Sequence, residues 1–148
     1  NSNPKTVLVD GDEMRQVFRT DQAHVDYNAA ARRTNAERIV RTCQWLDKQE
    51  LHVICSILCI FPDILQNNRN NYSDYFEIFL DAPLDQVEND DTKGIYSAGR
   101  SGRIKNVVGL DLPFPRPNNS DLMIDNSNPR SNPEDIAQLI IKTIESRP

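Results

Sequence analysis

The chain has 148 residues, of which 38% are hydrophobic and 26% are charged, and its net charge is −5 at pH 7. These values are typical of a single globular domain with one core, and we treat residues 1–148 as one domain. The negative charge excludes a whole-chain basic field for nucleic acid or anionic lipid, and no apolar stretch approaches the length of a membrane span. We therefore expect neither nucleic acid nor a membrane as a partner, and an anionic ligand must be met by local arginines and lysines.

The sequence contains three cysteines, Cys43, Cys55 and Cys59, two of them in the apolar run 53–61. An odd number without metal-ligand spacing disfavours a disulfide framework and fits a reducing compartment. Because no signal peptide opens the sequence, we expect a cytoplasmic location. We interpret Cys43 and Cys55 as small buried hydrophobic residues and leave the role of Cys59 open.

Four short apolar runs predict buried strands, because each is continuous rather than alternating. They cover residues 6–10, 52–58, 76–81 and 122–125. Between and after them lie helical patterns, one over residues 35–49 and another that starts at Asn132-Pro133 with a capping side chain before a proline. Alternation of strands and helices favours an α/β fold with one parallel sheet flanked by helices.

Two segments break this pattern. Residues 67–74, NNRNNYSD, predict a polar surface loop. Residues 89–121 have little apolar periodicity, four of the five glycines and a proline cluster at 113–117. A long irregular segment inside a compact domain is usually functional and is often a lid over a site. Its cations, Lys93, Arg100, Arg103 and Lys105, suit a lid that closes over phosphates, although charge alone favours a solvated basic loop.

The first predicted strand ends at Asp10-Gly11-Asp12, and Arg15 follows one turn later. Ligands of open α/β sheets bind outside the carboxyl ends of the strands, where these residues lie. A single aspartate at this place would be interpreted as a helix cap. Two carboxylates around a glycine, followed by an arginine, favour a binding or catalytic site instead.

The sequence KGIYSAGRSGRIKNVVGLDLPFPRP (93–117) resembles, in order and spacing, the lid motif of the adenylyl-sulfate kinases. The opening TVLVDGDEMR resembles the L-D-G-D-x-x-R motif of this family, and YNAAARRTNAER (27–38) resembles F-S-x-x-D-R-x-x-N-I-R-R. The resemblance extends from about residue 6 to the C-terminus. It implies a three-layer α/β/α P-loop kinase fold with a lid segment, residues 91–117. It also implies phosphorylation of the 3′-hydroxyl of adenosine 5′-phosphosulfate by ATP with Mg²⁺, and hence a place in sulfate assimilation.

The resemblance implies roles for individual residues. Either Asp10 or Asp12 would orient the attacking hydroxyl or a magnesium-bound water, and Lys93 is the third candidate catalytic residue. Tyr27 stands where the family stacks a phenylalanine on adenine, and Arg32 with Asn35 matches the pair that binds phosphosulfate and ribose. The candidate substrate-binding residues are Asp12, Arg15, Tyr27, Arg32, Asn35, Leu58, Cys59, Lys93, Asn106 and Val107. No residue is assigned as a metal ligand.

The sequence departs from the family pattern at several of these positions. Val107 replaces the lid phenylalanine, Val108 replaces a threonine, and Cys59-Ile60 replaces Ser-Pro. Asp90 and Ala31 also differ from the arginine and aspartate that are usual there. A weakened adenine clamp makes another nucleotide, such as a cytidine diphosphoramidate, the alternative acceptor.

The sequence contains no G-x-x-x-x-G-K-[ST] phosphate-binding loop. In kinases of this kind, the strand before that loop lies in the middle of the sheet, and its absence would leave two strands without a ladder partner. Either the natural protein has a further N-terminal segment, which we favour, or the chain is a non-catalytic nucleotide-binding relative. Members of the family are often dimeric, so a homodimer is the expected assembly.

Overall fold

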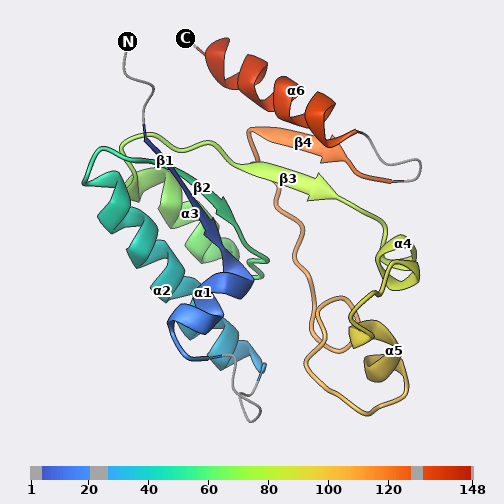
Figure 1. Ribbon diagram of the computed structural model, residues 1–148. Helices are drawn as coiled ribbons and strands as arrows, with labels where there is room; N and C mark the ends of the chain where they lie inside the picture. Colours follow the sequence, from blue (N-terminus) through green and yellow to red (C-terminus); the bar gives the residue numbers. More distant parts are fainter. Residues whose placement is uncertain (1–4, 21–26, 128–131, 148) are drawn as a thin grey trace.

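The computed structural model describes residues 5–20, 27–127 and 132–147. Figure 1 shows strands and helices alternating along most of the chain. In chain order they are β1 (Thr6–Asp10), α1 (Gly11–Val17), α2 (Ala29–Asp47), β2 (His52–Ser56), α3 (Pro62–Asn71), β3 (Ile78–Asp81), α4 (Leu84–Asn89), α5 (Ile95–Arg100), β4 (Leu122–Asp125) and α6 (Pro133–Glu145). None of the helices in the described ranges is long and apolar enough to cross a membrane.

The strands pair in parallel, as expected, but not in one sheet. β1 pairs with β2 from Thr6 opposite His52 onward, and β3 pairs with β4 from Ile78 opposite Leu122 onward. Over the described residues these are two separate two-stranded sheets, so the expectation of a single sheet is wrong (Figure 1). Among these residues, no ladder of hydrogen bonds joins β2 to β3. This agrees with the expectation that two strands lack a ladder partner when the strand before the phosphate-binding loop is absent.

Two of the predicted strands are shorter than expected. β2 ends at Ser56, opposite the last residue of β1, so residues 57–58 have no strand beside them. β3 begins at Ile78 rather than at residue 76, because its partner β4 begins at Leu122. Strand length in both sheets is therefore set by the partner, which an apolar run alone does not reveal.

The larger core cluster lies between the first sheet and α2. Val9 of β1 packs with three residues at helical spacing on α2, namely Ile39, Cys43 and Leu46. The opposite face of this sheet is exposed at Leu8 and Ile54. Cys43 is buried as expected, whereas Cys55 is exposed, because β2 is an edge strand of a two-stranded sheet.

Three helix boundaries follow from capping. α2 begins at residue 29 rather than 35 because the side chain of Asn28 accepts a hydrogen bond from the Ala31 amide at 2.9 Å. α3 extends through most of the expected 67–74 loop, because Pro62 starts it and Ile64 and Asn68 are buried one turn apart. α6 begins after the cap Asn132, as predicted.

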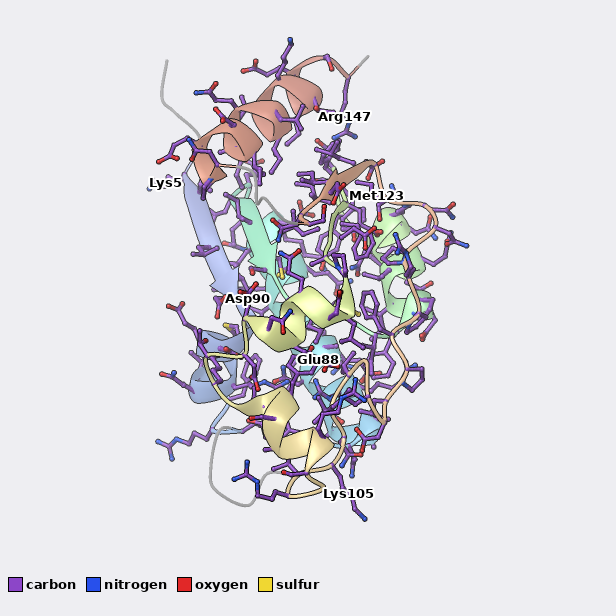
Figure 2. The ribbon with its side chains drawn as sticks, turned by 90° about the vertical axis from the view of Figure 1, so that its right-hand side faces the viewer. Lys5, Glu88, Asp90, Lys105, Met123 and Arg147 are labelled. Carbon is purple, nitrogen blue, oxygen red and sulfur yellow. The ribbon has the colours of Figure 1, made fainter. Side chains whose placement is uncertain are left out.

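The lid segment has a small apolar core of its own. Val107 and Val108 are 4% and 6% exposed. A Cβ atom on Gly99 would lie 2.9 Å from Leu110 Cδ1, so only glycine fits there without displacement of that side chain. Lys105 lies at the end of the molecule opposite Arg147 (Figure 2).

Candidate active site at the strand ends

Asp10, the last residue of β1, stabilises the turn into α1. Its Oδ1 accepts hydrogen bonds from the amides of Asp12 at 2.9 Å and Glu13 at 3.2 Å, which caps α1. The capping alternative is therefore realised for Asp10. This cap directs α1 away from the strand end and holds Asp12 and Arg15 on its first turns.

Asp12 is in contact with the lid segment. Lys93 Nζ donates a hydrogen bond to Asp12 Oδ2 at 2.8 Å, and both side chains are 69% exposed. This bond holds the pKa of the Asp12 carboxyl below its usual range and raises the pKa of the Lys93 ammonium. Two of the three candidate catalytic residues thus lie together, although they are far apart in the sequence.

Tyr27 lies beside two guanidinium groups. The Arg15 group is 5.0 Å from the centre of its ring and the Arg32 group is 5.7 Å from it, both within cation–π range. Burial lowers the pKa of Arg32, and the nearby charge of Arg15 adds to this shift. Both guanidinium groups lie over the Tyr27 ring, which is 42% exposed. The ring therefore offers a surface for a base next to two cations that can bind an anion.

Arg32 connects α2 to the lid segment. Its Nε donates to the Tyr27 carbonyl at 2.9 Å, and its Nη2 donates to the Asn106 carbonyl at 3.0 Å. The second bond joins residues 74 positions apart in the sequence. Arg32, Tyr27 and Asn106, three residues that the resemblance assigned to the substrate, are therefore brought together.

Of the remaining candidates, Asn35, Cys59 and Val107 are buried and Leu58 is exposed. Asn35 is 6% exposed, and its Oδ1 has no hydrogen-bond partner within the described part of the chain. Cys59 is 9% exposed in a cluster with Ala36 and Ile64, and burial raises the pKa of its thiol. Leu58 is exposed, whereas the Val107 side chain is buried inside the lid segment and is not presented as an open clamp.

Sequence reasoning overlooked Asp111. Its carboxylate accepts hydrogen bonds from the amides of Asn106 at 2.7 Å and Val107 at 2.6 Å. The bond from Asn106 is the main reason that the pKa of Asp111 lies below its usual range. The available signal was an aspartate shortly after Asn106 in a glycine-containing turn, which is typical of side chains that bind backbone amides.

The residues present do not supply a complete donor site. The sequence lacks a Gly-rich loop with Lys-Ser/Thr, the motif whose backbone amides cradle the phosphates of ATP. Within the described ranges, no group of three or more histidines, cysteines, aspartates and glutamates could hold a metal ion. What the described residues do bring together is an aromatic ring, two guanidinium groups and the Asp12–Lys93 pair.

Comparison with known families decides the class of this site. The family model described as adenylylsulphate kinase matches residues 1–125. The chain belongs to this family. Adenylylsulphate kinases are phosphotransferases with an alcohol group as acceptor, and the parallel strands flanked by helices agree with their P-loop kinase fold.

Curated relatives include members with different acceptors. The chain is 32% identical to the cytidine diphosphoramidate kinase of Campylobacter jejuni over 138 residues, which are 93% of this chain and 78% of that protein. It is 32% identical to a probable adenylyl-sulfate kinase of Synechocystis over 123 residues, 82% of this chain and 67% of that protein. It matches 18% of the bifunctional enzyme NodQ of Rhizobium tropici.

A solved structure supports the same assignment. The Mycobacterium tuberculosis APS kinase CysC in complex with AMPPNP and APS superposes with a TM-score of 0.81 at 28% identity. The alignment covers 97% of this chain and 81% of that one. The adenylylsulphate kinase fold is therefore shared over nearly the whole of the chain.

Proposed function

We propose that this adenylylsulphate kinase chain carries the acceptor site of an ATP-dependent enzyme that phosphorylates the 3′-hydroxyl of adenosine 5′-phosphosulfate. The product is 3′-phosphoadenosine 5′-phosphosulfate. The observation that supports this proposal is the Tyr27 ring beside the guanidinium groups of Arg15 and Arg32, under a lid segment that Lys93 joins to Asp12. Phosphoryl transfer needs mainly positioning and electrostatic stabilisation, which this arrangement supplies on the acceptor side.

Each residue of this arrangement has a role in the proposal. Tyr27 stacks on the base, and the two arginines donate hydrogen bonds to the phosphosulfate group. Asp12 exchanges its bond with Lys93 for one with the acceptor hydroxyl, while Asp10 keeps the turn in place as the cap of α1. The other proposed contacts to the acceptor are those of Asn35, Leu58, Cys59, Lys93, Asn106 and Val107.

The donor side of the proposal rests on the family. In this proposal, ATP with Mg²⁺ is the phosphoryl donor. Groups outside the described residues would bind its triphosphate. A cytoplasmic location, a role in sulfate assimilation and a homodimer belong to the same proposal. The buried Oδ1 of Asn35 has no hydrogen-bond partner among residues 5–20, 27–127 and 132–147, and a ligand hydroxyl would supply one.

Steady-state kinetics of the natural protein with two acceptors test this function. Adenosine 5′-phosphosulfate should give a kcat/KM at least about tenfold above that of cytidine diphosphate derivatives, equivalent to about 1.4 kcal/mol of preferential transition-state binding. A preference for the cytidine acceptor would overturn the adenylyl assignment and leave the kinase assignment intact.

Two observations favour a second candidate, a kinase for a cytidine acceptor. Val107 is buried within the lid segment, so its side chain does not offer an aromatic clamp for adenine. The Campylobacter jejuni relative that matches 93% of this chain is a cytidine diphosphoramidate kinase. A non-catalytic nucleotide-binding relative is distinguished from both by the lack of ATP hydrolysis or transfer with either acceptor.

A further inference from the structure

The corner formed by Asn106 and Val107 is held from two sides. Asp111 accepts both of its amides, at 2.7 Å and 2.6 Å. In return, the Val107 carbonyl accepts hydrogen bonds from the amides of Leu110, Asp111 and Leu112 at 3.1–3.2 Å. The corner is therefore closed by one carboxylate and one carbonyl into a single compact loop.

This corner has a backbone conformation that needs such support. Asn106 has a φ of 65°, in the left-handed region that residues other than glycine seldom adopt. Conformations of this kind cost free energy and persist where the surrounding structure determines them. The two short bonds to Asp111 supply that support at the strained residue and at the one after it.

The strained residue is also the one that touches the acceptor side of the site. The Asn106 carbonyl accepts the hydrogen bond from Arg32 Nη2, and Arg32 Nε binds the Tyr27 carbonyl. The same guanidinium lies 5.7 Å from the centre of the Tyr27 ring. The orientation of the Asn106 peptide therefore helps to set where the guanidinium of Arg32 lies beside that ring.

We propose that Asp111 is a positioning residue for the acceptor nucleotide. Its carboxylate fixes the Asn106–Val107 corner, the Asn106 carbonyl fixes one branch of the Arg32 guanidinium, and Arg32 presents its remaining N–H groups to the anionic part of the acceptor beside Tyr27. Asp111 acts through Arg32 and touches no substrate atom itself. The identity of the acceptor in this inference rests on the proposed function. The hydrogen bonds that link Asp111 through Asn106 to Arg32 do not depend on it.

A second aspartate of the lid segment shows what a purely local role looks like. Asp91 accepts hydrogen bonds from the amides of Ile95 and Ser97 at 2.8 Å and 2.9 Å, which order the start of α5. Within the described part of the chain, the hydrogen bonds of the Asp91 carboxylate stay inside this short segment. The hydrogen bonds of Asp111 instead lead through Asn106 to Arg32 on α2, which is far away in the sequence.

The test compares Asp111→Ala and Asp111→Asn with Asp125→Asn in the natural protein. Asp125 is a matched control, because it too accepts a backbone amide, that of Ser127 at 2.9 Å, but at the end of β4. We expect Asp111→Ala to raise the Kd for adenosine 5′-phosphosulfate about ten- to hundredfold, with Asp111→Asn in between and ATP binding unchanged. Equal losses for acceptor and ATP, or an equal loss in Asp125→Asn, would overturn the proposal.

A double-mutant cycle with Arg32→Ala separates positioning from general loosening of the lid segment. If Asp111 acts through Arg32, its substitution in the Arg32→Ala background should change the acceptor Kd less than about twofold. Full additivity of the two changes would overturn the proposal.

Hydrogen exchange of the ligand-free protein keeps this inference separate from the proposed function. The amides of Asn106 and Val107 should exchange about tenfold faster in Asp111→Ala than in the wild type. If wild-type protein binds no adenylyl acceptor but the exchange changes as expected, the proposed substrate is wrong and the same cycle is run with a cytidine diphosphate. If exchange at both amides is unchanged in Asp111→Ala, the positioning role is overturned. If Asp111→Ala is too unstable to measure, the same comparison is made with Asp111→Asn.

Discussion

Lys93 Nζ lies 2.8 Å from Asp12 Oδ2, which joins the start of the lid segment to the first turn of α1 across 81 positions of sequence. Both side chains are 69% exposed, so the pair adds little to global stability. In the proposed function, this pair is the contact that Asp12 exchanges for one with the acceptor hydroxyl. The pair therefore bears on the motion of the lid segment more than on the fold.

The first prediction concerns Asp12→Asn. We expect it to lower the free energy of unfolding by less than about 1 kcal/mol, because exposed ion pairs contribute little. Trypsin should cleave the ligand-free lid segment faster in the variant at low ionic strength, and the difference should shrink in high salt, which screens exposed pairs. Glu13→Gln, on the same helix, is the control and should behave like wild type. Identical cleavage of wild type and Asp12→Asn at low salt would show that the pair does not restrain the lid segment.

The second prediction concerns pH. The folded-state pKa of Asp12 is depressed, so the contribution of its pair is present above the unfolded pKa of about 4 and is lost as pH falls through the lower folded value. Between pH 5 and 9, titration of Asp12 should leave the contact intact. An NMR titration of the Asp12 carboxyl carbon should move to higher pH in Lys93→Ala and stay in place in Lys105→Ala. Superimposable curves for wild type and Lys93→Ala would contradict this.

The strands were the most predictable part of the fold. Residues 6–10 and 122–125 are short, β-branched or apolar, and bounded by polar turns, so local pattern was enough to place β1 and β4. The division into two sheets agrees with the expected loss of a ladder partner where the strand before the phosphate-binding loop is absent. Which strands pair was not predictable, because pairing depends on both partners and not on a single run. The start of α2 was placed too late because residues 29–34 carry no apolar stripe. The local signals were the cap Asn28 and the helix-forming run AAARR at 29–33.

The candidate site also has a part that the sequence predicts and a part that it does not. Asp12 and Arg15 were predicted because polar residues that follow a buried strand lie at the binding edge of an α/β sheet, and this role stays a prediction. The contact between Arg32 and the Asn106 carbonyl spans 74 positions, so only the family resemblance could suggest it. Asp111 was missed because it binds backbone amides, and a sequence shows no pattern for groups that every residue carries.

The third prediction tests whether restoring the aromatic lid residue is straightforward. Val107 is 4% exposed, and its Cγ2 lies 3.0 Å from the place of a Cβ on Gly99. Val107→Phe should therefore overpack the lid segment and lower the free energy of unfolding by about 1–3 kcal/mol. Ile104→Phe is the control, because Ile104 is 41% exposed and has room for a larger ring. If chemical denaturation shows Val107→Phe to be as stable as wild type, the side chain can turn outward, and the acceptor preference of the variant becomes the measurement to make.

The last prediction compares two neighbouring arginines of α2. Arg32 binds the carbonyls of Tyr27 and Asn106, whereas Arg33 forms a two-pronged pair with Asp63 at 2.8 Å and 3.0 Å on the surface. Removing either one deletes the same charge from the same helix, so long-range electrostatics and helix propensity are matched.

Arg32→Ala should weaken acceptor binding by about 1.5–3 kcal/mol, because a charge-assisted contact in a closing site is lost, and it should leave ATP binding unchanged. Arg33→Ala should change acceptor affinity less than about threefold, because exposed pairs contribute little. Arg32→Lys should not restore binding, since an ammonium lacks the planar fork that serves two carbonyls and an anion together. Calorimetric titration of both nucleotides into the three variants measures all of this. Equal acceptor affinities for Arg32→Ala and Arg33→Ala would show that Arg32 braces the lid segment without contacting the acceptor.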